Sequence, residues 1–383
     1  MIYNIGDNIV SPLGFTTEEN WNSVLHGRSG LARYEGKFGL PEPFFAAILD
    51  EDAVNERFGK IYSGKERYTK FEKMAMLSVS DAVQRAGISC ADREVVFVLS
   101  TTKGNVELLE DACGYEEDRK YLWKSAQLIA QFFGNPNEPV VVSNACISGC
   151  AAQITAARLL QRGYRYAVVV GADVLSRFII SGFQSFKALS PEQCRPFDSA
   201  RCGLNLGEAA ATIVYSVSPK GSPTGGEKAL VCGAICNDAN HISAPSRTAE
   251  GLVAALRKVL PPQRIPDVAL VSAHGTATLY NDDMESVAIH RMQLAEVPVN
   301  SLKGYFGHTL GAAGILETIL GFCEVGEGVL LPTAGTQNPG TLMPLNVVLT
   351  RKKTGKVSFL KIISGFGGSN AAILCQWQKG GGQ

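Results

Sequence analysis

One cysteine stands where a predicted strand gives way to a predicted helix, and that placement suits acyl-transfer chemistry. Cys146 follows the valine-rich stretch 138–144 and precedes a helix of small residues predicted over 147–162. Unpaired N–H groups and the helix dipole at such a start are expected to lower the pKa of the thiol and favour the attacking thiolate. The same N–H groups could hold the oxyanion formed when the thiolate attacks a thioester. Taken alone, the stretch equally fits a small apolar residue that fills the core.

Two of the five histidines occupy comparable positions. His274 ends the predicted strand 267–274 and opens the polar turn "HGTAT", and His308 precedes a second small-residue helix predicted over 309–324. The carboxyl ends of parallel strands meet at one edge of a sheet, so both rings are expected beside Cys146. There they could act as base and donor, or as two donors to an enolate. A thioester can span the three groups when the rings lie within roughly 8 Å of the sulfur. The alternative is a pair of core histidines.

Charged residues flank both histidines. Lys303 lies five residues before His308, and Glu317 lies nine residues after it in a helix otherwise made of Gly, Ala, Ile and Leu. A carboxylate in such a helix needs a partner, and Lys303, which alone would be read as a surface lysine, is the natural candidate. Asp282 and Glu285 begin the predicted helix 281–293, where they either face the helix dipole or support His274.

Apolar strands alternate with helices along the chain, which predicts an α/β fold with a sheet covered on both faces. The remaining predicted strands cover 94–101, 165–173, 209–216, 229–236, 357–365 and 371–377, and the remaining helices 68–86 and 247–259. Strand–junction–helix patterns in the first half recur in the second, which predicts a duplicated unit. The turn-rich "SPTGGEK" is the expected boundary, giving an N-terminal half over 1–222 that holds the cysteine and a C-terminal half over 223–383 that holds both histidines.

Composition narrows the classes of function. The 383 residues carry 36 basic and 36 acidic side chains, so the zero formal charge points to neither nucleic acid nor an anionic membrane. The apolar runs are too short for a membrane span. Ten scattered cysteines without metal-site spacing predict reduced thiols, no metal centre and a cytoplasmic protein.

Four ordered motifs together resemble the β-ketoacyl-(acyl-carrier-protein) synthases, the elongating condensing enzymes with the thiolase fold. They are "NACISG" around Cys146, the central "CRPFDSARCGLNLGEAAA", "HGTAT" with Asp282, and "SLKGYFGHTLGAAG". The resemblance runs from near the start of the chain to "GFGGSN" near its end. It implies a duplicated α-β-α-β-α architecture with two central mixed sheets.

The resemblance also implies a role for each residue of these motifs. Cys146 would carry the acyl group as a thioester. His274 and His308 would promote malonyl decarboxylation and stabilise the enolate that attacks this thioester. Lys303, held by Glu317, would support the histidines.

The substrate arm and a gate are implied in the same way. Thr276 and Thr278 would contact the phosphopantetheine arm. Phe366 would gate the cysteine, its backbone N–H joining that of Cys146 in the oxyanion hole. Taken alone, Phe366 equally fits an aromatic residue packed in a turn.

The implied partners are an acyl carrier protein, malonyl and acyl thioesters, and a second copy of the chain in a homodimer. No resident cofactor is expected, since phosphopantetheine arrives on the carrier. A basic rim for an acidic carrier is expected among Lys60, Lys65, Arg67, Lys70, Lys73, Arg195 and Arg201, although a solvated helix face explains the first five slightly better.

Two alternatives to fatty acid elongation stay open. One is a ketosynthase of a dedicated polyene or polyketide pathway, suggested by the unusual segment 100–124. The other is a non-catalytic partner subunit, which the presence of Cys146 opposes. Two departures from the family pattern place Ala277 and Ala209 where glycine is usual. Alanine should preserve the backbone there unless a positive φ is required.

Overall fold

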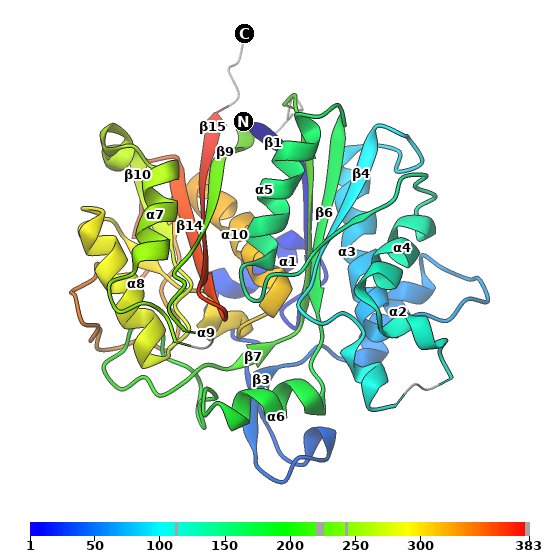
Figure 1. Cartoon of the computed structure of the whole chain (residues 1–383), viewed down its shortest axis with the longest axis horizontal. Helices are drawn as coiled ribbons and strands as arrows, with labels where there is room; N and C mark the ends of the chain where they lie inside the picture. Colours follow the sequence, from blue (N-terminus) through cyan, green and yellow to red (C-terminus); the bar gives the residue numbers. More distant parts are fainter. Residues whose placement is uncertain (112–113, 220–225, 242–243, 380–383) are drawn as a thin grey trace.

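The structure is a computed structural model that describes residues 1–383 except 112–113, 220–225, 242–243 and 380–383 (Figure 1). Five strands from the N-terminal half lie in the order β1-β8-β6-β4-β5. Pairing is parallel between β5, β4 and β6, and antiparallel from β6 through β8 to β1. These strands are β1 (Ile2–Val10), β4 (Val95–Ser100), β5 (Val140–Val142), β6 (Tyr166–Asp173) and β8 (Ala209–Ser216).

Five strands from the C-terminal half repeat this arrangement in the order β9-β15-β14-β10-β11. Again the outer three are parallel and the inner ones antiparallel. They are β9 (Gly226–Asn237), β10 (Val268–Ser272), β11 (Val299–Asn300), β14 (Ser358–Gly365) and β15 (Ser369–Lys379). Order and direction therefore recur as the sequence repeat predicts. The expected boundary between 222 and 223 lies outside the described residues.

The two sets of strands are joined edge to edge. β1 pairs with β9 from Ile2 opposite Leu230 to Asn4 opposite Lys228. The predicted α/β fold is confirmed, with one difference: the two expected sheets form one continuous ten-stranded sheet.

Three layers of helices surround these strands. In Figure 1, α5 and α10 lie in the middle, with α3 and α4 on the N-terminal side and α7 and α8 on the C-terminal side. Their bounds are α3 (Lys70–Ala86), α4 (Leu122–Phe132), α5 (Ser148–Leu160), α7 (Glu250–Val259), α8 (Leu279–Arg291) and α10 (Ala313–Glu327). The middle pair contacts strands of both halves, so residues at its N-termini are brought to the centre of the molecule.

Local signals set the ends of the outer helices. The Thr69 side chain and Glu72 form a reciprocal capping box at the start of α3, and Gly87 ends that helix in the left-handed region at φ 66°. Such caps satisfy backbone groups that the helix leaves unpaired. This is why the predicted helix 68–86 agrees closely with the observed one.

The remaining elements are shorter. The other helices are α1 (Thr17–Leu25), α2 (Glu51–Gly59), α6 (Arg177–Ser185) and α9 (Lys303–Phe306), and the other strands are β2 (Ala32–Tyr34), β3 (Phe44–Ala47), β7 (Leu206–Gly207), β12 (Val329–Leu330) and β13 (Lys352–Lys353). Single 3-10 turns cover Lys37–Gly39, Val106–Leu109, Glu117–Lys120, Pro262–Asp267 and Leu310–Ala312. Across the described ranges, no helix combines the length and apolar character that crossing a membrane requires.

Candidate active site

Glycine lets the two middle helices meet backbone to backbone. A Cβ on Gly314 would lie 2.6 Å from the Cys150 nitrogen, and one on Gly149 would lie 3.0 Å from the Gly311 oxygen. A side chain at Gly314 would force the backbones to shift, and one at Gly149 would press tightly on the facing segment. The small residues noted in the sequence thus serve close packing, which draws the turn containing Cys146 toward the turn containing His308.

Cys146 lies in the tight turn between β5 and α5. Ala145 adopts a positive φ of 44°, and the helix begins two residues beyond the cysteine, at Ser148. The Cys146 side chain is 7% exposed. Burial raises the pKa of the Cys146 thiol, and this outweighs the lowering by the charges of Lys103 and Lys303 and by the Phe366 N–H. The predicted lowering of this pKa is therefore wrong, because desolvation exceeds the effect of the nearby positive charges and the Phe366 N–H.

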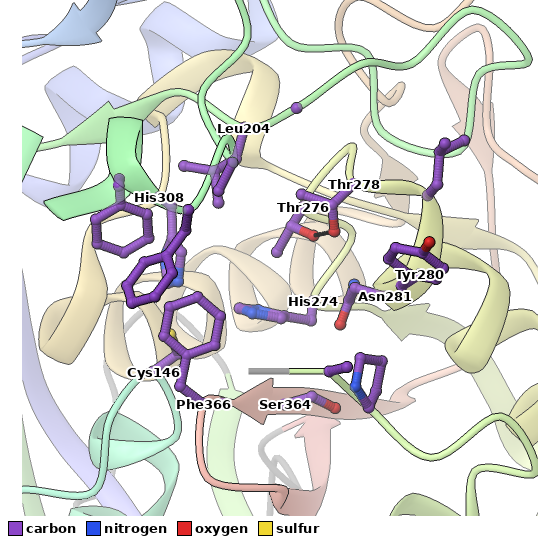
Figure 2. Close-up of a pocket in the computed structure, with 18 of the residues that line it drawn as sticks. Cys146, Leu204, His274, Thr276, Thr278, Tyr280, Asn281, His308, Ser364 and Phe366 are labelled. Atoms are coloured by element: carbon purple, nitrogen blue, oxygen red, sulfur yellow. Dashed lines mark hydrogen bonds between the residues drawn. The ribbon is translucent and has the colours of Figure 1, made fainter. Parts of the chain in front are cut away.

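The two predicted histidines do lie beside this cysteine. The Cys146 Sγ and one ring nitrogen from each of His274 and His308 all lie within 4.8 Å of one another. The rings meet edge to face, with centroids 4.9 Å apart and an interplanar angle of 83°. Figure 2 shows the His274 ring pointing toward Cys146. The separation is well inside the roughly 8 Å that a shared thioester requires.

Hydrogen bonding indicates which nitrogen of His308 carries the proton. Its Nδ1 accepts the Leu310 N–H at 3.2 Å, so the hydrogen of a neutral ring sits on Nε2. Neither His308 Nε2 nor His274 Nδ1 has a hydrogen-bond partner among the described residues, although both side chains are buried. His308 therefore presents a free donor.

Both imidazoles are held in the neutral form. Burial, followed by the positive charge of Lys303, lowers the pKa of His274 and the pKa of His308 well below the usual value. His308 adds to the lowering at His274, and Lys103 adds to it at His308. Neutral rings can donate hydrogen bonds to an anion or accept a proton near neutral pH.

The predicted pair of Lys303 and Glu317 forms, and a second lysine joins it. Lys303 Nζ lies 2.5 Å from Glu317 Oε1, and Lys361 Nζ lies 2.5 Å from Oε2. Both lysines are fully buried. Although burial raises it, the charges of Lys303 and Lys361 hold the pKa of Glu317 below its usual value. Sequence reasoning missed Lys361, whose signal was a lone charge inside the apolar strand "FLKIIS".

Asp282 and Glu285 support the turn that carries His274. Glu285 accepts the backbone N–H groups of His274 and Gly275, each at 2.7 Å. Asp282 accepts the N–H groups of Thr276 and Phe197 at 3.0 and 2.8 Å. Burial raises the pKa of Asp282 to about 6 and that of Glu285 to about 7. Both carboxylates face backbone amides, so they organise this turn.

A cavity of about 380 Å³ is lined by Cys146, His274 and His308 (Figure 2). Thr276 and Thr278 line it, and their hydroxyl oxygens are 2.8 Å apart. Exposed Leu279 and Tyr280 also line this cavity. It therefore offers hydroxyl groups between the surface and Cys146, where the sequence predicts the phosphopantetheine arm.

Phe366 lines both this cavity and a second one of about 280 Å³. Its ring stacks on Phe183 at 5.9 Å and meets Phe186 edge to face at 5.7 Å. Among the described residues that line the second cavity, Lys103 carries the one charged side chain; the others are mainly apolar residues of α6 and its neighbours. Sequence reasoning missed Lys103, which lies in the unusual segment 100–124.

The two alanine departures differ in backbone conformation. Ala277 has a φ of 62°, the left-handed region that favours glycine. Ala209 lies in the extended strand β8. A positive φ is therefore required at the first position, and the chain tolerates alanine there.

Two residues expected on a basic rim are not available to a partner. Arg201 is 5% exposed and bonds Asp283 at 2.6 Å. Lys70 lies 2.5 Å from the buried Glu208 carboxylate. The sequence could not reveal these pairs, because the partners are distant along the chain.

The cysteine and the two histidines are also a possible ligand set for a thiophilic ion such as Zn²⁺. The raised pKa of the buried Cys146 thiol and the nearby charge of Lys303 oppose a dication at this point. The geometry fits a thiol nucleophile with two neutral imidazoles better.

Comparison with known proteins gives a consistent result. Residues 2–216 match the N-terminal domain of beta-ketoacyl synthases, and residues 229–337 match their C-terminal domain. The chain is 32% identical to 3-oxoacyl-[acyl-carrier-protein] synthase 2 of Rhizobium meliloti (strain 1021), covering 96% of this chain and 97% of that one. It is 27% identical to the synthase of the same name from Synechocystis sp. (strain ATCC 27184 / PCC 6803 / Kazusa), covering 96% of each.

Solved structures share the fold. The chain superposes with a TM-score of 0.85 on a chain of the ketosynthase ApeO in complex with its chain length factor ApeC from Xenorhabdus doucetiae. That likeness is 23% identical and covers 98% of this chain and 97% of that one. Together with the domain matches, it agrees with the thiolase-like fold and the clustered cysteine and histidines: the chain belongs to the beta-ketoacyl synthase family of acyltransferases.

Proposed function

We propose that this β-ketoacyl synthase elongates acyl chains by decarboxylative condensation, with Cys146 as the acyl carrier in the site. The observation that carries the proposal is the approach of the Cys146 sulfur and two imidazole nitrogens within 4.8 Å. That spacing lets one thioester contact all three groups. Fatty acid elongation is the reading that the 32% identical relative supports by its name.

In the first half-reaction, the Cys146 thiolate attacks the carbonyl carbon of an acyl thioester. The bond from that carbon to the carrier sulfur breaks, and the carrier leaves as a thiol after taking up a proton. The raised pKa of the buried Cys146 thiol means that the proton must be removed as substrate arrives. A neutral imidazole nitrogen within 4.8 Å of the sulfur is the available base. His274 fits this role, because His308 carries its hydrogen on Nε2 and accepts the Leu310 N–H at Nδ1.

In the second half-reaction, malonyl thioester loses CO₂, and the electron pair of the broken C–C bond becomes an enolate. His308 Nε2–H and His274 donate hydrogen bonds to the enolate oxygen. The enolate carbon attacks the acyl-Cys146 carbonyl, the C–S bond breaks, and the Cys146 thiolate is released. The product is a 3-oxoacyl thioester two carbons longer. No redox or metal cofactor is needed, because decarboxylation supplies the carbanion.

The acyl tail would occupy the second cavity, beyond Phe366. Its lining of Phe178, Phe183, Phe186 and Leu310 suits an apolar chain. A fatty acid role and a dedicated polyene or polyketide role share the same chemistry and differ in which tail this cavity accepts. We propose an acyl carrier protein as the donor in either case, a homodimer as the assembly and the cytoplasm as the compartment.

Mass spectrometry of the intact protein tests the function. Wild-type protein is incubated with a panel of acyl carrier thioesters, and an acyl adduct on Cys146 is expected. Malonyl carrier protein should then discharge that adduct and yield a 3-oxoacyl product. Cys146→Ala is the matched control, and a product from it, or a wild-type protein that never acylates, would overturn the proposal. Saturated chains among the preferred acyl groups would support fatty acid elongation over the specialised role.

A further inference from the structure

Lys361 is a buried cation beneath the histidine pair for which the proposed reaction has no assigned use. It lies in the middle of β14, is 0% exposed, and forms an ion pair with Glu317. Glu317 is therefore held by two lysines, one on each carboxylate oxygen.

The remaining contacts of Lys361 lead to His274. Its Nζ donates to the carbonyl oxygens of Ser272 at 3.1 Å and Ala273 at 2.9 Å. These two residues join the end of β10 to His274. Its ammonium group thus makes two hydrogen bonds to backbone and one ion pair to Glu317, all of them within the buried core. Lys361 can thus act on the reaction through its charge and its anchoring of the His274 turn.

The buried charged groups beneath the two rings carry an excess of positive charge. Two lysines face one glutamate there, a net charge of +1. On α8, Asp282 faces Arg201, and Glu285, whose pKa burial raises to about 7, is partly protonated near neutral pH. Burying an uncompensated cation is costly, so a bound anion would be favoured at this point.

We propose that Lys361 is a positioning residue for the condensation, anchoring the His274 turn and supplying the second positive charge that favours an enolate beside the two imidazoles. The inference rests on the proposed function. Lys361 is also among the charges that, after burial and Lys303, lower the pKa of both histidines. It therefore has two effects: it keeps the rings neutral at lower pH, and it stabilises negative charge on the substrate.

The test compares Lys361→Met with the double variant Lys361→Met/Glu317→Gln. The single change leaves Lys303 and Glu317 as a neutral pair, and the double change restores the net charge to +1. The rate of single-turnover condensation is measured as a function of pH, starting from protein that is already acylated on Cys146. Loss of the charge raises the imidazole pKa, so the acid limb should move up by about one pH unit. At pH 7 the rings stay neutral, and the rate should fall about tenfold because the enolate loses one stabilising charge.

The double variant should return the acid limb toward the wild-type position, which a purely structural role for Lys361 would not produce. Acylation of Cys146 at pH 7 should fall less than condensation in the single variant, because no enolate forms in that half-reaction. Exposed Lys352→Met serves as the matched control. Lys361→Gln, which keeps a donor for the Ala273 carbonyl, repeats the test if Lys361→Met does not fold.

Two results would overturn the proposal. One is an unshifted acid limb of the pH–rate profile in a folded Lys361 variant, and the other is an acid limb that shifts as far in the double variant as in the single one. NMR titration of the histidine rings gives the same comparison without turnover. Failure of the proposed function would instead appear as a wild-type protein that neither acylates nor condenses, whatever the ring titration shows.

Discussion

The two halves of the molecule place different chemistry at equivalent junctions. The turn after β5 in the N-terminal half carries Cys146, and the turn after β11 in the C-terminal half carries Lys303 and His308. Likewise, the end of β4 leads to Lys103, whereas the end of β10 leads to His274. The duplicated topology brings all of these positions to one place, so Cys146 and the two imidazoles come from opposite halves.

Electrostatics separates the halves further. Near the cysteine, the buried Asp173 carboxylate accepts the Gly311 N–H at 2.7 Å and the Thr102 N–H at 3.0 Å. Beneath the histidines, two buried lysines share Glu317. The Asp173 arrangement holds the backbone of two neighbouring turns in place, and the lysine arrangement adds positive charge. One scaffold, used twice, thus holds a buried thiol in one copy and a positively charged histidine site in the other.

The largest effect is expected from removing the nucleophile of the N-terminal half. Cys146→Ala should lower the rate of condensation at least about 10³-fold, because no other group can carry the acyl chain at this position. Product formation by mass spectrometry is the measurement. Circular dichroism should be unchanged, since alanine is a small side chain that fits the site. Substantial turnover by this variant would mean that the two halves do not divide the chemistry as described.

The next effect concerns the C-terminal half. His308→Ala should slow condensation about 10²-fold, because it removes the free Nε2–H donor from the enolate. Acyl transfer to Cys146 should persist at a larger fraction of its normal rate. The two half-reactions are measured separately, and exposed His26→Ala is the control. Equal losses in both half-reactions would contradict the assignment of His308 mainly to the enolate.

The contact between the halves depends on glycine. In Gly314→Ala the new Cβ would lie 2.6 Å from the Cys150 nitrogen, so the free energy of unfolding should fall by about 1–3 kcal/mol. Gly355→Ala is the matched control, because nothing lies within 4 Å of its Cβ position. Urea denaturation of both proteins gives the comparison. Equal stability of the two would show that the helices need no such close approach.

Lys103 should influence the cysteine more than any other residue of its cavity. Its charge lowers the pKa of the Cys146 thiol against the effect of burial, so Lys103→Met should raise that pKa and reduce the thiolate fraction. Alkylation by iodoacetamide at pH 8 should slow about threefold to tenfold, with the pH midpoint moving upward. Exposed Lys187→Met, in the larger cavity, should leave the profile in place. An unshifted profile for Lys103→Met would remove this residue from the site.

The smallest effect concerns the two alanines that stand where relatives favour glycine. Ala277→Gly should raise the free energy of unfolding by about 0.5–1 kcal/mol, because glycine adopts the φ of 62° without strain. Ala209→Gly, in an extended and buried strand, should lower it by about 1 kcal/mol. Thermal unfolding of both variants measures the difference. Changes of the same sign would contradict the backbone argument.

Local sequence patterns alone determined the order of helices and strands and the grouping of the main site residues. The alternation of apolar strands and helices predicted the α/β order, and the positions of Cys146, His274 and His308 at strand ends predicted that they would meet. These inferences hold because periodicity, caps and glycine turns act over a few residues, and because parallel strands direct their carboxyl ends to one edge.

Tertiary structure decided the electrostatics. Lys361 reaches Glu317 from a different element, Arg201 is buried against Asp283, and the Cys146 thiol has a raised pKa despite its place before a helix. The physical reason is that desolvation and ion pairing depend on which groups share a low-dielectric interior. Groups far apart in the sequence come together there only when the chain folds.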